Sequence, residues 1–99
     1  MISLKVHESY RKVIAVCDTD IIGKKFFEGN RQLDLRESFY SGENLEKEKA
    51  VHSLKRFKLD DATFNIVGKK AIQVAIDAGL IDENGFDYVD GIPFSLILL

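Results

Sequence analysis

Two segments of nearly the same sequence hold the residues best suited to bind a charged ligand. The sequence "DIIGKK" occupies positions 20–25 and "NIVGKK" occupies positions 65–70, so each places a glycine before two lysines. Backbone N–H groups at a helix start, together with lysine ammonium groups, suit an anion such as phosphate. A Walker-type nucleotide loop also needs an earlier glycine and a Ser or Thr after the lysine, and both segments lack them. The candidate anion-binding residues are Lys24, Lys25, Gly68, Lys69 and Lys70.

A structural interpretation of the same segments stays open. Gly68 can serve close packing or helix capping, with the lysines solvated. The two segments also continue differently, because a helical period follows Lys70, whereas Phe26 and Phe27 follow Lys25. A duplicated motif would keep one period after both copies, so the sequence does not indicate an internal repeat.

Metal binding and nucleophilic catalysis have little support in the sequence. His7 and Cys17 are expected at opposite ends of a hairpin, separated by five residues of about 3.4 Å each, too far for one ligand sphere. Cys17 is expected in the core, where burial raises the thiol pKa and leaves it inert. No serine stands in a nucleophile-elbow context, and the carboxylates do not form a pair at catalytic spacing. We therefore expect no metal and no cofactor, and a non-enzyme rather than an enzyme.

The segment "ESFYSGE" (37–43) places two aromatic residues, Phe39 and Tyr40, in a predicted loop. One interpretation is a helix-entry contact with one ring in the core. The other is an exposed ring that offers a stacking surface for a nucleic-acid base. Tyr40 is therefore included among the candidate binding residues.

The elements that would position these residues follow from hydrophobic periodicity. "ISLKVHE" (2–8) and "KVIAVCD" (12–18) predict an antiparallel hairpin in which Val6 faces Val13, Leu4 faces Ala15 and Ile2 faces Cys17, all on one face. "KFFEGNRQLDL" (25–35) predicts two short strands around a Gly-Asn turn. The last segment, 86–99, predicts one or two strands, with a bend at Gly91 and Pro93.

Two stretches have the period of amphipathic helices. The first spans roughly 45–58, and its apolar stripe is Ala50, Val51, Leu54 and Phe57. The second lies within 65–81, with Asn65 as a candidate N-cap and Gly79 at its end. Its stripe comprises Val67, Ala71, Val74, Ala75 and Ala78. The element order predicts an α+β fold of two layers, with two principal helices on one face of a mainly antiparallel sheet.

Composition limits the classes of protein further. The 99 residues predict a single domain, 1–99, and one cysteine excludes an intramolecular disulfide and suits a reducing cytoplasm. A net charge of −2 means that nucleic-acid binding would need local clustering of lysines. No apolar run approaches the length of a membrane span, and the first ten residues are expected to form a strand rather than a signal peptide.

Several stretches together resemble a known family in their order and spacing. "KVHES", "VIAVCDTDIIGKKFFEG", "LDLRESFYSGE", "FNIVGKKAIQVAIDAGLID" and "GIPF" resemble small archaeal proteins of the family called domain of unknown function 424, over essentially the whole chain. The resemblance implies a cytoplasmic archaeal protein with a compact α+β fold, no established activity, and a link to RNA or translation as an expectation. The pattern often has His after its Pro, where this chain has Phe94. The recurring positions of the family fall on His7, Cys17, Asp18, Gly23, Phe39, Tyr40, Gly42, Asn65, Ile66, Val67, Gly68, Gly91 and Pro93.

Three functional hypotheses follow. The first is a non-catalytic module that binds RNA or a ribonucleoprotein, with Lys24, Lys25, Lys69, Lys70, Asn65 and Tyr40 on one surface. The second is a small enzyme or small-molecule binder with a polar pocket at Asp18, His7 and Asn65. The third is a structural protein whose apolar end, "FSLILL" (94–99), completes its own sheet or pairs with a neighbour to form an oligomer.

Overall fold

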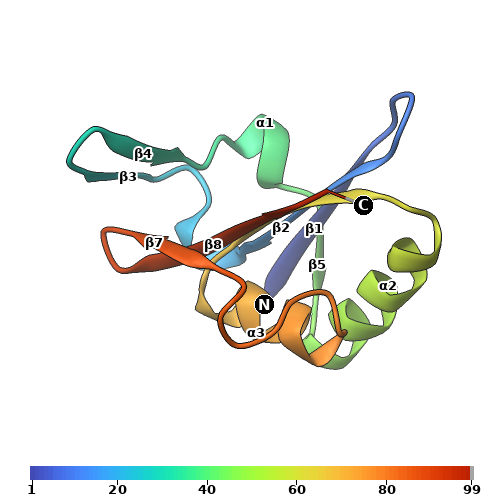
Figure 1. Ribbon diagram of the computed structural model, residues 1–99. Coiled ribbons are helices and arrows are strands. Elements are labelled where there is room, and N and C mark those ends of the chain that lie inside the picture. Colours follow the sequence, from blue (N-terminus) through green and yellow to red (C-terminus); the bar gives the residue numbers. More distant parts are fainter. Residues whose placement is uncertain (99) are drawn as a thin grey trace.

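The protein is an α+β fold built on one six-stranded sheet (Figure 1). The computed structural model describes residues 1–98. The strands are β1 (Ile2–His7), β2 (Val13–Asp18), β3 (Lys25–Glu28), β4 (Arg31–Asp34), β5 (Glu43–Leu45), β6 (Thr63–Val67), β7 (Asp87–Val89) and β8 (Ile92–Ile97). The helices are α1 (Glu37–Tyr40), α2 (Lys47–Leu59) and α3 (Lys69–Asp77), and η1 (Thr19–Ile21) is a single 3-10 turn. As predicted, the two long helices lie on one face of a mainly antiparallel sheet.

The strand order of the large sheet is β5-β1-β2-β6-β8-β7, and β3 and β4 form a separate hairpin. Only β2 and β6 run parallel, and the other described pairs are antiparallel. The connection from β2 to β6 includes α2, because a parallel pair needs a long crossover that returns the chain to the same end of the sheet. Consequently the last residues of β2 and β6 lie at the same end of the sheet, where Cys17 is beside Val67.

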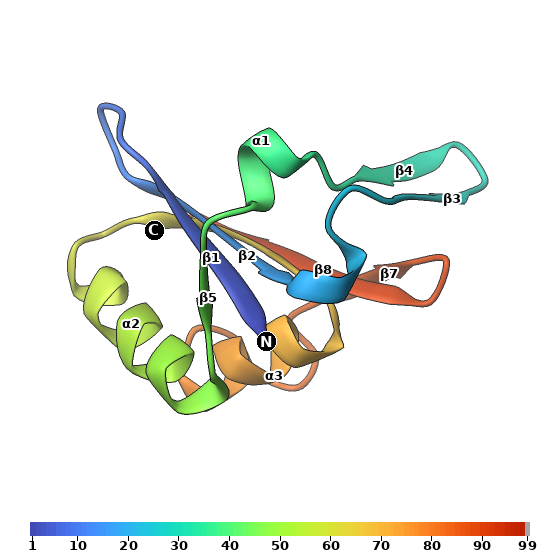
Figure 2. The same cartoon turned by 180° about the vertical axis from the view of Figure 1, so that it is seen from behind.

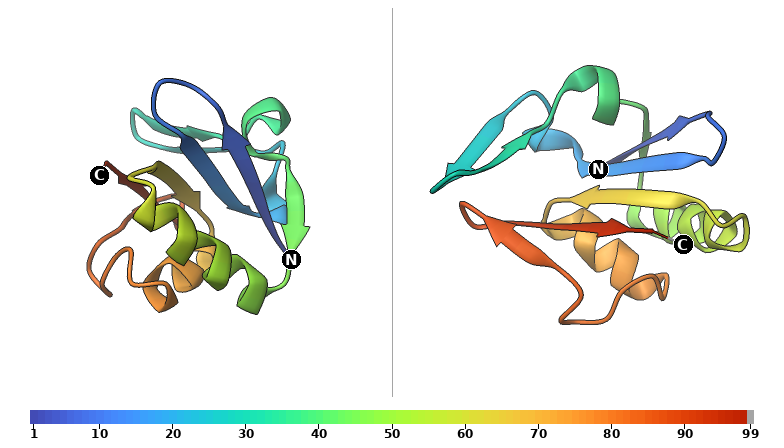
Figure 3. Two further views of the ribbon diagram at one scale, coloured as in Figure 1. Left: turned by 90° about the vertical axis from the view of Figure 1, so that its right-hand side faces the viewer. Right: turned by 45° about the horizontal axis from the view of Figure 1, so that its top comes forward.

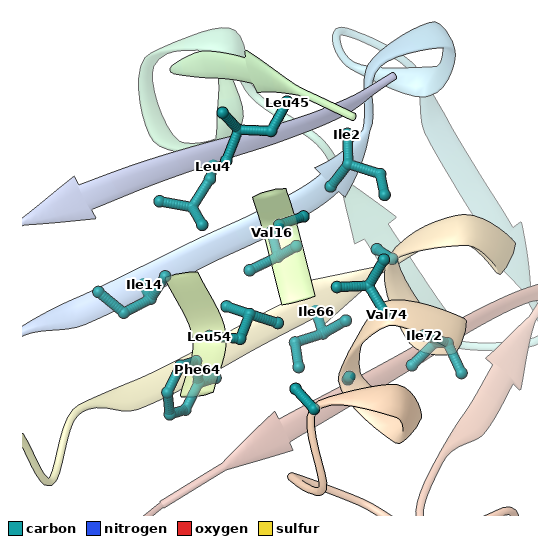
Figure 4. Close-up of a cluster of buried hydrophobic side chains, with 14 of the residues drawn as sticks. Ile2, Leu4, Ile14, Val16, Leu45, Leu54, Phe64, Ile66, Ile72 and Val74 are labelled. Carbon is teal, nitrogen blue, oxygen red and sulfur yellow. The ribbon is translucent and has the colours of Figure 1, made fainter. Parts of the chain in front are cut away.

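The main core lies between the sheet and the two long helices (Figure 4). Phe64 is its largest fully buried side chain. The predicted stripe of α2 is confirmed: Ala50 and Leu54 are buried, and Val51 and Phe57 pack beside them. Of the second predicted stripe, Ala71, Val74, Ala75 and Ala78 are buried in this core, whereas Val67 belongs to strand β6 and to the cluster on the other face. The predicted end of α3 is confirmed as well, since Gly79 has φ +77° and the Leu80 N–H donates to the Ala75 carbonyl at 2.9 Å.

The predicted register of the first hairpin is wrong by one residue. Val6 lies opposite Ile14, Leu4 opposite Val16 and Ile2 opposite Asp18. Five residues, 8–12, connect the two strands, whereas the prediction assumed a tighter turn at Ser9 and Tyr10. Because strand side chains alternate between faces, a shift of one residue moves a strand's whole apolar set to the other face. Thus Ile14 and Val16, rather than Val13, Ala15 and Cys17, face the helices.

The beginning of the second predicted helix is also corrected. The residues before Gly68 form strand β6, parallel to β2, so Asn65 pairs with Ala15 and is not an N-cap. The N-cap of α3 is Gly68 itself.

The second face of the sheet, opposite α2 and α3, carries a smaller cluster. Cys17, Leu35 and Val67 are buried there, under the β3–β4 hairpin and α1 (Figure 2). The hairpin is also tied to β7 and to the β7–β8 turn, because Arg31 pairs with Asp87 at 3.0 Å and the Asp90 N–H donates to Glu28 Oε1 at 2.7 Å. Helix α1 and strand β5 were not predicted, since α1 is a single turn within the expected loop 37–43 and β5 has only three residues, from the end of that loop to the expected start of the first helix.

Candidate functional site

A pocket of about 550 Å³ opens at the end of the sheet where β2 and β6 stop. The first turn of α3, the first turn of α2 and the beginning of β1 surround it. Its lining residues are Met1, Ile2, Glu46, Lys47, Lys69, Lys70 and Gln73. Three of the seven are lysines and one is a glutamate, so an excess of positive charge remains that can attract an anion.

The start of α3 is fixed by a carboxylate from the neighbouring strand. Asp18, the last residue of β2, accepts hydrogen bonds from the Lys70 N–H at 3.1 Å and the Ala71 N–H at 2.8 Å. Gly68 allows this approach, because a Cβ there would lie 2.4 Å from Asp18 Cγ. The anion-binding amides of this helix start are thus occupied by the protein's own carboxylate. An external anion in the pocket would meet the lysine side chains instead.

The charges around the pocket are only partly compensated. Lys47 pairs with Asp77 at 3.2 Å, and Gln73 Nε2 donates to the same carboxylate at 3.0 Å. The hydrogen bond from Gln73 and then that from Lys47 lower the pKa of Asp77 below its ordinary value, so it stays ionised. Lys69 and Lys70, by contrast, have no acidic side chain within ion-pair distance in the described chain.

The two Gly-Lys-Lys segments begin at the same end of the sheet. Figure 2 shows η1, which follows β2, beside the first turn of α3. The chain then turns through Gly23, whose φ is +90°, and the Lys24 N–H donates to the Ile21 carbonyl at 3.2 Å. Lys24 and Lys25 lead into the β3–β4 hairpin and do not line the pocket. Lys69 and Lys70 therefore line the pocket. Lys24 and Lys25 do not line it, although they follow η1, which begins at the same end of the sheet.

The other two proposed binding residues lie elsewhere. Asn65 is on the second face of the sheet, between Ala15 and Leu96. Tyr40 is half-buried against the Cys17 cluster, and burial, followed by electrostatic interaction with Cys17 and Asp34, raises its pKa to about 12. Neither residue lines the lysine pocket.

Polar side chains of β1 hold α1 against the second face. The Ser3 hydroxyl donates to the Tyr40 carbonyl at 2.8 Å, and the Lys5 ammonium donates to the Ser38 carbonyl at 2.8 Å. His7 Nε2 lies 2.8 Å from the Phe39 carbonyl, and the two rings stack with centroids 4.5 Å apart. Three consecutive carbonyls at the end of a short helix are thus satisfied by alternate residues of one strand. The polar positions of β1, which alternate with its apolar ones, were the sequence signal for this contact.

Comparison with known proteins places this geometry in a family. A family model described as protein of unknown function (DUF424) matches residues 6–99. The chain belongs to this family. It is also similar to a crystal structure of an uncharacterized conserved protein from Methanopyrus kandleri, an archaeon, with a TM-score of 0.87 and 28% sequence identity. That similarity covers 98% of this chain and 91% of the other. No match was found among curated proteins.

Several positions that the resemblance to the DUF424 family singled out have structural roles here. Asp18 and Gly68 form the start of α3, and His7 and Phe39 fasten α1. Gly42 passes so close to β1 that a Cβ would lie 2.3 Å from the Leu4 carbonyl oxygen. Gly91, with φ +77°, forms the turn between β7 and β8, and Pro93 follows within β8. These residues maintain the fold that carries the pocket.

The polar pocket expected at Asp18, His7 and Asn65 does not form in this DUF424 protein. His7 and Asp18 lie at opposite ends of the first hairpin, since His7 pairs with Val13 and Asp18 with Ile2. The two residue pairs are five residues apart along the strand, or about 17 Å, which is too far for direct proton transfer between His7 and Asp18. Within residues 1–98, no group of three or more His, Cys, Asp or Glu side chains could hold a metal ion. No described helix is long and apolar enough to span a membrane.

We expect the single cysteine to be unreactive in the folded protein. Cys17 is fully buried, and burial, followed by the Asp18 and Asp20 charges, raises its pKa to about 12. A raised thiol pKa keeps the sulfur protonated, so about one molecule in ten thousand is a thiolate at pH 8. DTNB absorbance should therefore rise very slowly for the native protein and reach one equivalent promptly in concentrated guanidinium chloride. Rapid stoichiometric labelling of the native protein would contradict this.

Proposed function

We propose that this protein is a non-catalytic binding module for RNA, which it contacts through the lysine pocket at the start of α3. The observation that supports the proposal is that Lys69 and Lys70 line a pocket and lack an acidic partner within ion-pair distance in the described chain. Lys24 and Lys25 follow η1, which begins where β2 ends, and the proposal assigns them further contacts to the RNA backbone outside the pocket. The proposal places the protein in the cytoplasm of an archaeal cell, in keeping with the source of its relative.

The pocket combines features that suit a nucleotide unit. Phosphate oxygens would approach the Lys69 and Lys70 ammonium groups, where they gain charge-assisted hydrogen bonds. The Met1 side chain, about half exposed, offers an apolar wall against which a base can pack. Since the protein carries a net charge of −2, the attraction must come from this local cluster, and its strength should fall with added salt.

Replacing both unpaired lysines should weaken RNA binding. For the Lys69→Gln/Lys70→Gln variant, we expect the Kd for a fluorescently labelled single-stranded RNA to rise by about tenfold at low salt. The slope of log Kd against log salt should decrease by about 1.4, since each phosphate contact to a single strand contributes about 0.7. Fluorescence anisotropy titrations at two or more salt concentrations would measure both quantities.

The matched control removes two positive charges from α2, away from the pocket. Lys55 and Arg56 are exposed, so the Lys55→Gln/Arg56→Gln variant changes the net charge equally but leaves the pocket intact. We expect this control to bind RNA like the unmodified protein. Absence of binding at low salt, binding without salt dependence, or equal weakening in both variants would refute the proposed function.

A further inference from the structure

The outer edge of β8 is left without a neighbour over its last residues. Strand β7 pairs with Ile92, Pro93 and Phe94, whereas β8 continues to Ile97. Across residues 1–98, no other strand pairs with this outer edge beyond Phe94. Figure 3 shows this end of β8, near the C-terminus, at the margin of the molecule. The second half of β8 is therefore an edge without a strand partner, although the Ser95 hydroxyl donates to the Gly85 carbonyl at 2.9 Å.

The direction of the backbone groups follows from a single hydrogen bond. The Gly68 N–H donates to the Pro93 carbonyl at 2.8 Å, so Pro93 directs its carbonyl toward β6. In an antiparallel ladder this direction alternates, and Ser95 and Ile97 also face β6. Leu96 therefore directs its N–H and C=O away from β6. Leu98 follows directly after the last residue of β8, and extension of the strand by one residue would give its backbone groups the same direction.

The side chains on this edge are apolar and uncharged. Leu96 is 59% exposed and Leu98 is 72% exposed. Leu96 lies on the second face of the sheet, opposite Asn65, and extension of β8 by one residue would place Leu98 on the same face. Exposed edge strands are usually protected by a charged residue, a proline or a bulge. The sequence Ser-Leu-Ile-Leu at 95–98 contains no charge and no proline. The edge thus offers main-chain hydrogen bonds beside an apolar stripe.

We propose that β8 pairs with β8 of a second copy of this chain, antiparallel about a two-fold axis beside Ile97. In this register Leu96 exchanges both main-chain hydrogen bonds with Leu98 of the partner subunit, and the reciprocal pair does the same. Four leucine side chains then meet on one face, and no charges oppose each other because the segment has none. An interface in which the same segment is used by both copies closes as a dimer.

The other edge of the sheet fits this role less well. Strand β5 is short and carries the exposed Glu43 and Asn44. Pairing of β8 with β5 of another copy would place a carboxylate beside the leucines and would leave further edges open, giving chains instead of dimers. Self-pairing of β8 avoids both effects.

The proposed dimer is independent of the lysine pocket. Since β8 is antiparallel to β6, Ile97 lies beside Phe64 at the beginning of β6, whereas the pocket lies beyond the end of that strand. The two proposed sites are thus at opposite ends of the sheet. Loss of the dimer and loss of RNA binding can be observed separately.

Sedimentation velocity on the full chain, from about 1 µM to about 1 mM, tests the dimer. We expect a monomer–dimer equilibrium whose Kd rises by at least about tenfold in the Leu96→Lys/Leu98→Lys variant. Leu59 is 84% exposed outside any strand, so Leu59→Lys is the matched control and should dimerise normally. Amide hydrogen exchange provides a second measurement: the Leu96 and Leu98 N–H groups should become protected as concentration rises.

Three outcomes would overturn the proposal. One is a monomer throughout this concentration range, with Leu96 and Leu98 amides that exchange freely. Another is a dimer that the lysine substitutions leave unchanged. The third is growth of species larger than a dimer, which would indicate open-ended edge pairing.

Discussion

The Gly68→Ala substitution is expected to lower the free energy of unfolding by at least about 3 kcal/mol. Gly68 has φ +112°, a region that a residue with a Cβ rarely adopts. The added Cβ would also lie 2.4 Å from Asp18 Cγ and 2.5 Å from its Oδ1. Asp18 is buried, so moving it would separate its carboxylate from the Lys70 and Ala71 N–H groups without offering water in exchange.

Urea unfolding followed by circular dichroism would measure this loss. The control is Gly91→Ala, because Gly91 has φ +77° but nothing within 4 Å of the added Cβ. It should lose only about 1 kcal/mol, from backbone strain alone. A double-mutant cycle separates the two causes at Gly68: in an Asp18→Ala background the clash is removed, and Gly68→Ala should cost only the backbone strain of its φ +112°, ψ 155° conformation. If Gly68→Ala were no worse than Gly91→Ala, the close packing of Asp18 would be refuted.

The two helices and their buried faces were predictable because helical periodicity is a local property. Ala50 and Leu54 lie one turn apart in the chain, and both are buried as their spacing indicates. The α+β class followed from the same patterns. In each case a window of a few residues contains the whole signal.

The hairpin register was not predictable from local pattern, and strand β6 was missed. Apolar residues occupy 13–17 without alternation, so either face of β2 could have been the buried one. Both faces are in fact covered, by the helices and by the cluster around Cys17. Residues 63–67, Thr-Phe-Asn-Ile-Val, are mostly β-branched or aromatic and so suit a strand, but β6 pairs with β2 about 50 residues away, and the residues from Asn65 onward were assigned to the following helix instead.

The candidate site was predicted in part. Lys69 and Lys70 were identified from the Gly-Lys-Lys pattern, and they line the pocket. Lys47 and Gln73 were missed, since α2 and α3 bring them there through packing that no spacing rule encodes. The position of Asn65 was misjudged because it was assigned to a helix start, whereas a strand residue at that position points to the second face of the sheet.

The Gly42→Ala substitution is expected to lower the free energy of unfolding by at least about 3 kcal/mol, as much as Gly68→Ala. At Gly42 the only cause is steric overlap, without a contribution from backbone strain. Gly42 connects α1 to β5, and its added Cβ would lie 2.3 Å from the Leu4 carbonyl oxygen and 2.8 Å from Lys5 Cα. These are backbone atoms of β1, so no change of side-chain rotamer can relieve the overlap. The chain must move away from β1, which breaks the hydrogen bond from the Gly42 N–H to Ser3 Oγ at 2.8 Å.

This displacement should be visible apart from the loss of stability. If α1 moves away from β1, the His7 ring loses its stack on Phe39, and the His7 ring protons should shift in the NMR spectrum. Gly29→Ala is the control, since Gly29 has φ +62° in the β3–β4 turn with nothing within 4 Å of an added Cβ. It should cost only about 1 kcal/mol and leave the His7 signals in place. Because Gly42, unlike Gly29, does not have a positive φ, a small loss in Gly42→Ala with unchanged His7 signals would mean that α1 and β5 do not lie against β1 as described.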